Sequence, residues 1–155
     1  MKVLFVCLGN ICRSPLAEAV FKHKIQSEKF GKNVLADSCG TSNYHIGDLP
    51  DERTRKNAAK NGVEMSHRGR QISASDLKEF DYILAMDRSN YHNILNLPGA
   101  DSYHHKVLLM RAFDPEEGDE VPDPYYGSEE DFQEVFDILD RAVDGFINRI
   151  RKELL

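Results

Sequence analysis

Three residues near the amino terminus have the types and the spacing of a site that processes an anion. Cys7 ends a short apolar run, and Arg13 and Ser14 follow it six and seven positions later. A cysteine thiolate is a strong nucleophile, and the planar guanidinium of arginine can hold two oxygens of a phosphoryl group. Gly9 would let the backbone approach such an anion closely. The segment therefore predicts a phosphate-binding loop with a nucleophile at its base.

A second polar segment supplies a carboxyl group and two aromatic rings. Asp123 stands between Pro122 and Pro124, which bias its backbone toward a stiff, extended conformation. A carboxylic acid held in this way can protonate a departing oxygen. A phenolate needs that proton to leave, because the parent phenol has a pKa of about 10. Tyr125 and Tyr126 follow directly and could form an aromatic wall for a substrate that carries a ring.

The elements that must position these residues alternate between strand and helix patterns. Short apolar runs predict strands at 3–6, 33–37, 81–86 and 106–110. Helical patterns are found at 15–30, 50–61, 88–96 and 129–153. The alternation predicts an α/β fold with a parallel sheet and helices on both faces. Ligands of such sheets bind outside the carboxyl ends of the strands, where Cys7 would lie.

The start of the first helix is predicted by Ser14 and Pro15. The Ser14 hydroxyl could cap this helix, or it could donate a hydrogen bond to Cys7 when Cys7 becomes the leaving thiolate. Serine is favoured as an N-cap and proline at the first helical position. The segment from Cys7 to Arg13 would then join the end of a strand to the beginning of a helix. Backbone N–H groups and the helix dipole favour anions there.

Composition narrows the class of protein. The length of 155 residues suggests one domain, and the net charge of −6 argues against nucleic acid as a partner, since phosphate backbones need a basic face. No stretch approaches the roughly 18 apolar residues of a membrane span. The chain lacks a signal-peptide pattern. Its three cysteines are an odd number and give no disulfide framework. We therefore expect a cytoplasmic protein with reduced thiols and no membrane partner.

With both segments placed, the chain closely resembles the low-molecular-weight protein tyrosine phosphatases over nearly its whole length. The resemblance rests on the segments 7–14, 37–38, 81–87 and 123–127. It implies one phosphatase domain over residues 1–155, with three layers, a central four-stranded parallel sheet of order 2-1-3-4 and helices on both faces. It also implies hydrolysis of phosphotyrosine and aryl phosphates without a metal or cofactor.

The resemblance assigns roles to residues of both segments. It implies that Cys7 forms a cysteinyl-phosphate intermediate and that Arg13 binds the phosphoryl group. Asp123 would protonate the leaving group and then activate water. The positions that match the family's loop-bracing network are Asn10, Ser14, Ser38 and His67. The positions expected to contact substrate are Leu8, Gly9, Asn10, Ile11, Cys12, Ser14, Tyr44, Tyr125 and Tyr126. Tyr44 stands where many members of the family have tryptophan, so the substrate selectivity of this chain stays open.

The remaining cysteines are treated separately. Cys12 belongs to the family pattern and could form a reversible disulfide with Cys7 under peroxide, or it could be a small buried residue under the loop. Cys39 receives no role. The adjacent pair His104 and His105 does not suit one metal ion, so no metal site is predicted.

Partners and two other functions remain to be weighed. The expected partner is a phosphotyrosine-containing protein, and tyrosine kinases are among the candidates. Phosphate or other oxyanions are expected to bind in the loop as inhibitors. The protein is expected to be a monomer or a weak homodimer. Whether Tyr125 or Tyr126 is phosphorylated stays open.

The thioredoxin-coupled arsenate reductases are an alternative, because they share the Cys-x5-Arg loop. They carry a further cysteine pair on a segment after the third strand, whereas residues 86–97 of this chain contain no cysteine. A phosphate-binding module without catalysis would need neither Cys7 nor Asp123.

Overall fold

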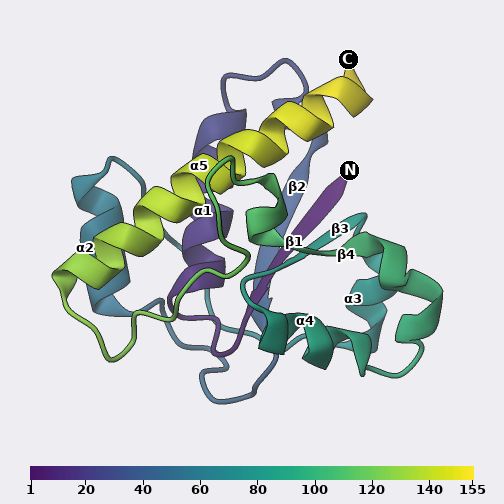
Figure 1. The fold of residues 1–155 in the computed structure, drawn as a ribbon, viewed down its shortest axis with the longest axis horizontal. Helices are drawn as coiled ribbons and strands as arrows, with labels where there is room; N and C mark the ends of the chain where they lie inside the picture. Colours follow the sequence, from purple (N-terminus) through teal and green to yellow (C-terminus); the bar gives the residue numbers. More distant parts are fainter.

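A parallel sheet lies at the centre of the protein, whose computed structural model describes residues 1–155 (Figure 1). Its four strands are in the order β2-β1-β3-β4. The strands are β1 Lys2–Cys7, β2 Leu35–Gly40, β3 Tyr82–Ala85 and β4 Val107–Leu109. The helices are α1 Arg13–Ile25, α2 Glu52–Lys60, α3 Ala74–Glu79, α4 Arg88–Leu95 and α5 Glu129–Leu154. Short 3₁₀ segments are η1 Gly31–Asn33, η2 Ala100–Lys106 and η3 Met110–Phe113. The predicted fold class and strand order are confirmed.

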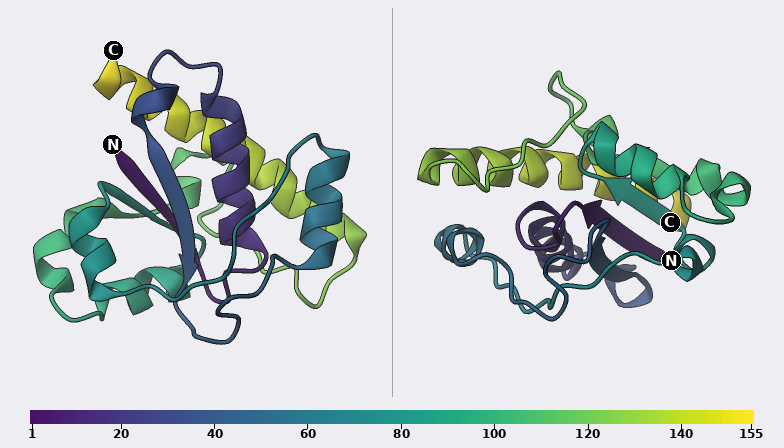
Figure 2. Two further views of the ribbon diagram at one scale, coloured as in Figure 1. Left: turned by 180° about the vertical axis from the view of Figure 1, so that it is seen from behind. Right: turned by 90° about the horizontal axis from the view of Figure 1, so that it is seen from below.

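The helices cover both faces of the sheet. In Figure 1 and in the left view of Figure 2, α1, α2 and α5 lie to one side of the strands, and α3 and α4 lie to the other. Val3, Phe5 and Cys7 belong to the buried cluster shared with α1 and α5. Leu4 and Val6 belong to the second cluster, shared with α3 and α4. This alternation along β1 is what a strand buried on both faces requires, because successive side chains point to opposite faces.

The first helix begins and ends earlier than predicted. It spans Arg13–Ile25 rather than 15–30, and its N-cap is Cys12, not Ser14. Of the two roles proposed for Ser14, the N-cap is wrong and the contact with Cys7 is confirmed, because its hydroxyl contacts Cys7 and Asn10 instead of capping the helix. After Ile25 the chain turns back, and a Cβ at Gly31 would clash with the Ile25 carbonyl oxygen.

The second strand also differs from its prediction. It spans Leu35–Gly40 rather than 33–37, so residues 38–40, which the prediction left outside the strand, are paired with β1. Ser38 pairs with Phe5, and Cys39 pairs with Val6. Pairing with a central strand overrides the weak strand propensity of serine and glycine. The other predicted strands and helices were placed within about two residues, the usual uncertainty of element ends. No helix has both the length and the apolar character of a membrane span.

Phe146 joins α5 to the rest of the core and provides a test of stability. Its ring centroid lies 5.6 Å from that of Phe21, and 5.1 Å from those of Tyr82 and Phe113. We expect Phe146→Ala to lower the free energy of unfolding by about 3–5 kcal/mol, since it leaves a cavity in a close-packed core. Urea denaturation measures the loss. Phe146→Leu, which keeps most of the volume, should lose clearly less, and equal losses would contradict this account.

Candidate active site

The loop between β1 and α1 wraps around the sulfur of Cys7. Cys7 ends β1 and is buried, with Sγ 3.0 Å from Ser14 Oγ. The backbone N–H of Asn10 donates to the same sulfur over 3.3 Å. Asn10 has a φ of 57°, a left-handed conformation that asparagine tolerates better than most residues. The Asn10 N–H stabilises negative charge on the sulfur, and the Ser14 hydroxyl does so when it donates to Sγ rather than to the Cys39 carbonyl, 3.3 Å away.

The side chain of Asn10 connects the loop to three other segments. Its Nδ2 donates to Ser14 Oγ over 2.8 Å and to Ser38 Oγ over 3.0 Å. Its Oδ1 lies 2.7 Å from His67 Nε2 and accepts the backbone N–H of Arg70 over 3.0 Å. The structure thus brings together the residues expected to brace the loop, and it adds the backbone of Arg70 to them.

Arg13, the first residue of α1, is buried and aimed across the end of the sheet. Its Nη1 donates to Asp87 Oδ2 over 2.7 Å and to the carbonyl oxygen of Val121 over 3.0 Å. Its Nη2 lies 3.8 Å from Asp123 Oδ2. Burial alone would lower the pKa of the guanidinium, but the negative charges of Cys7 and Asp87 outweigh it and raise that pKa. Arg13 is therefore a permanent, oriented cation.

Asp87 is the residue of this site that the sequence analysis did not single out. It lies two residues after the end of β3 and caps α4, where its Oδ1 accepts the N–H of Asn90 over 2.8 Å. The same carboxylate orients Arg13 through its other oxygen. A helix-capping aspartate at the carboxyl end of a strand was the available signal. That signal alone does not show that Arg13 is the partner of this carboxylate.

The segment with Asp123 faces the loop from the other side. The Asp123 side chain is about half exposed, and its Oδ1 accepts the N–H of Tyr125 over 3.1 Å. The rings of Tyr125 and Tyr126 pack edge to face, with centroids 4.9 Å apart. The Arg53 guanidinium lies over the ring of Tyr125, 5.3 Å from its centroid. Arg53 of α2 therefore contacts the aromatic wall and helps to position it, in addition to the contacts within the 123–126 segment.

A cavity of about 350 Å³ lies between these two segments. Cys7, Arg13 and Asp123 all line it. Its apolar and aromatic walls come from Leu8, Ile11, Tyr44, Tyr125 and Tyr126. Gly9, Cys12 and His45 complete the lining.

Two residues expected to contact substrate lie elsewhere. Asn10 and Ser14 are buried and are not among the residues that line the cavity; their side chains contact one another. His45, which the sequence analysis left unassigned, does line it.

Cys12 and Cys39 differ chemically from the predicted nucleophile. Burial raises the pKa of the Cys12 thiol to about 12. Burial also raises the pKa of Cys39 well above its usual range, and Cys39 is fully enclosed in the second core cluster. Both are neutral thiols at pH 7, so neither competes as a thiolate.

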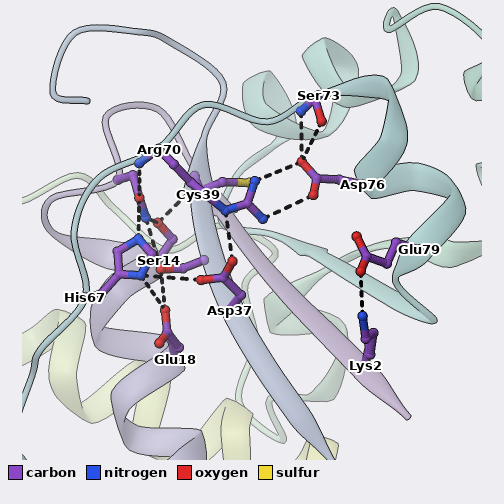
Figure 3. A network of polar contacts seen from close by, with 12 residues as sticks. Lys2, Ser14, Glu18, Asp37, Cys39, His67, Arg70, Ser73, Asp76 and Glu79 are labelled. Carbon is purple, nitrogen blue, oxygen red and sulfur yellow. Dashed lines mark hydrogen bonds and ion pairs between the residues drawn. The ribbon is translucent and has the colours of Figure 1, made fainter. Parts of the chain in front are cut away.

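Glu18, Asp37 and His67 form a cluster behind the loop, seen in Figure 3. His67 Nδ1 lies 3.1 Å from Glu18 Oε1 and 3.4 Å from Asp37 Oδ1. Burial would raise the pKa of Glu18, but hydrogen bonds from His67, Lys22 and Ser38 outweigh it and lower that pKa. Lys22 and Arg70 already neutralise the two carboxylates. The cluster is therefore an ion-pair network, which has no need of a metal ion.

Comparison with known proteins agrees with this geometry. The family described as "Low molecular weight phosphotyrosine protein phosphatase" matches residues 2–155. The low molecular weight phosphotyrosine protein phosphatase of Gallus gallus is 42% identical over 148 residues, covering 95% of this chain and 94% of the relative.

Solved structures of two phosphatases share this fold. A protein tyrosine phosphatase of Entamoeba histolytica, determined with Hepes in its active site, superposes with a TM-score of 0.94. It is 44% identical and covers 100% of this chain and 99% of its own. A Drosophila arginine phosphatase superposes with a TM-score of 0.87 at 32% identity, covering 97% of this chain and 98% of its own. Cys7 and Arg13 lie in the phosphate-binding loop of this fold. The chain belongs to the low molecular weight protein tyrosine phosphatases, hydrolases that act on phosphotyrosine.

Proposed function

We propose that this chain removes phosphate from phosphotyrosine in proteins, with Cys7 as nucleophile, Arg13 as phosphate ligand and Asp123 as general acid and base. One observation carries the assignment of roles. A single cavity is lined by a thiol with two hydrogen-bond partners, a permanently charged guanidinium and a half-exposed carboxyl group.

In the first step the Cys7 thiolate attacks phosphorus. The S–P bond forms while the bond from phosphorus to the phenolic oxygen breaks, and Asp123 gives its proton to that oxygen. Arg13 and the loop N–H groups hold the three remaining phosphoryl oxygens, over which the transition-state charge is spread. Asp87 keeps the Arg13 fork aimed at them.

In the second step water releases the phosphate. The Asp123 carboxylate accepts a proton from the water, whose oxygen attacks phosphorus as the S–P bond breaks. The electron pair returns to sulfur, so Cys7 leaves as a thiolate. The Ser14 hydroxyl, 3.0 Å from that sulfur, stabilises the charge as it develops.

The walls of the cavity favour an aromatic substrate. Tyr44, Tyr125 and Tyr126 offer ring faces and edges, and Leu8 and Ile11 offer apolar contact. The Drosophila arginine phosphatase raises phosphoarginine as a second substrate class. Asp123 is the only carboxylate among the lining residues, so a guanidinium would find no partner apart from the catalytic acid. We therefore favour phosphotyrosine.

Partners and conditions follow from this chemistry. Candidate substrates are phosphotyrosine proteins, including tyrosine kinases, and oxyanions such as phosphate would compete for the loop. The thiolate requires a reducing compartment such as the cytoplasm. Under peroxide, Cys7 would become a sulfenic acid. Cys12, a neutral thiol, would have to lose its proton to attack that sulfur, and the disulfide would form with release of water. The exposed Tyr126, 97% accessible, is compatible with a monomer or a weak homodimer.

The test uses the native chain with a reductant and EDTA, in a buffer without a sulfonate. A phosphotyrosine peptide and a phosphoarginine peptide of the same sequence are compared, and reactions are quenched in acid for peptide mass analysis. We expect release of phosphate from phosphotyrosine and one phosphoryl group on the peptide that contains Cys7. Faster turnover of phosphoarginine would overturn the substrate assignment, and a phosphoryl group on another residue would overturn the mechanism.

The role of Asp123 predicts a dependence on the leaving group. We expect Asp123→Asn to lower kcat for phosphotyrosine about 10²- to 10³-fold. The loss should be much smaller for p-nitrophenyl phosphate, whose phenolate leaves without a proton. Asp119→Asn is the control, because Asp119 lies in the same acidic segment but pairs with Arg88. Steady-state kinetics on both substrates measure the two losses of kcat. An equal loss on both substrates would exclude Asp123 as the acid.

A further inference from the structure

Behind the phosphate loop, Arg70 joins three segments that are distant in sequence (Figure 3). It lies in the segment between α2 and α3 and does not line the cavity. We infer that Arg70 is a positioning residue for the proposed reaction, acting on Cys7 through Asn10. The inference rests on the proposed function for its kinetic consequences but not for its structural ones.

The first step concerns the orientation of the Asn10 amide. The backbone N–H of Arg70 donates to Asn10 Oδ1, and His67 Nε2 contacts the same oxygen. Because Oδ1 is occupied on this side, Nδ2 must face Ser14 and Ser38. Arg70 thereby helps decide which way the amide points.

The second step concerns the backbone of Asn10. Its φ of 57° is the only positive value in the chain outside glycine. A left-handed residue persists only where surrounding contacts determine it. In this conformation the Asn10 N–H points at Cys7 Sγ. Loss of a contact to the side chain therefore weakens the hydrogen bond to the nucleophile.

The third step concerns what holds Arg70. Its Nε donates to Asp37 Oδ2 over 2.8 Å, which ties it to β2. Its Nη1 and Nη2 donate to the two oxygens of Asp76 over 3.0 and 3.1 Å, a bidentate pair. Asp76 is buried and completes the capping box of α3 with Ser73. The guanidinium thus clamps its own backbone between β2 and α3.

Backbone contacts alone do not replace this clamp. The Arg70 carbonyl accepts the N–H of Gly40, and Gly40 accepts the N–H of Ile72, so the segment lies along the end of β2. These bonds fix its distance from β2. The guanidinium adds the tie to α3, on the side away from the loop. Without it, we expect the N–H of Arg70 to drift from Asn10 Oδ1.

The test compares Arg70→Met, which keeps the length and loses the donors, with Arg70→Lys, which keeps the charge. Asp76→Asn removes the other half of the bidentate pair. Arg149→Met is the matched control, since Arg149 lies on α5 and pairs with Glu153. Each variant is assayed for kcat, KM, inhibition by orthophosphate, and amide hydrogen exchange of peptides from 8–13 and from α5.

We expect Arg70→Met to lower kcat roughly 10- to 100-fold, as small misplacements of catalytic groups do. Exchange in 8–13 should accelerate while exchange in α5 stays unchanged, orthophosphate should inhibit less, and Arg70→Lys should recover part of each effect. Asp76→Asn should change kcat, exchange in 8–13 and orthophosphate inhibition in the same direction as Arg70→Met. Arg149→Met should leave all three at the native values.

Two results would overturn the inference. One is native-like exchange in 8–13 with native-like orthophosphate inhibition in Arg70→Met. The other is acceleration in α5 to the same extent, which would assign Arg70 to general stability. If the native chain has no phosphatase activity, the exchange measurements still decide the positioning role, because they require no turnover.

Discussion

Cys7→Ser is expected to abolish hydrolysis, with a loss of kcat of at least about 10⁴-fold. A serine hydroxyl stays protonated at neutral pH, and the cavity holds no base in contact with that position to ionise it. The sulfur is also the leaving group of the second step, and an alkoxide would leave far less readily. Hydrolysis of p-nitrophenyl phosphate and of a phosphotyrosine peptide measures the loss.

Binding should survive this substitution, which separates chemistry from recognition. Arg13 and the loop N–H groups are unchanged in Cys7→Ser, so a phosphotyrosine peptide should still bind, as titration calorimetry can measure. The matched control is Cys39→Ala, because Cys39 is buried in the second core cluster outside the cavity. Activity of Cys7→Ser near the native rate, or an equal loss in Cys39→Ala, would rule out the thiol mechanism.

Arg13→Lys is expected to lower kcat/KM about 10³-fold, the scale at which a catalytic arginine contributes to phosphoryl transfer. A lysine keeps the charge but has no planar fork to hold two oxygens. It would also leave one or more of the Asp87 carboxylate, the Val121 carbonyl and the phosphoryl group without a donor. Steady-state kinetics with orthophosphate inhibition measures the effect.

The pattern of losses distinguishes Arg13 from Cys7. Arg13→Lys should weaken orthophosphate binding as well as turnover, whereas Cys7→Ser should spare binding. Asp87→Asn is the graded control, since it keeps the shape of the hydrogen-bond acceptor and removes its charge. It should lose less than Arg13→Lys. Unchanged orthophosphate inhibition in Arg13→Lys would show that the guanidinium does not bind phosphate.

The chemistry of the phosphate loop could be predicted from the sequence because its signals are local. Cys7, Gly9 and Arg13 lie in one strand-loop-helix unit, where short-range geometry brings their functional groups together. The periodicity of the strands and of α5 is equally local, and it predicted the fold class. Asp123 could be proposed because its flanking prolines restrict its own backbone.

The structure corrected the sequence where a residue's role depends on a distant partner. Ser14 has the residue type and position of an N-cap, but its hydroxyl contacts Cys7, the other role proposed for it, and Asn10. Ser38 reads as loop, but pairing with Phe5 makes it part of a strand. In both cases long-range contacts outweigh a local preference whose free energy is small.

By itself, the sequence predicted the fold class, and it singled out Cys7, Arg13 and Asp123 as the candidate nucleophile, phosphate ligand and acid, since each is marked by its own neighbours in the chain. Only the tertiary structure decided that Asp87 orients Arg13, that Asn10 is left-handed, and that Arg70 supports Asn10. These contacts join strand ends and loops that are far apart in the chain. A hydrogen bond between distant segments leaves no periodic or spacing signal in either of them, so it can be recognised only once packing has brought them together.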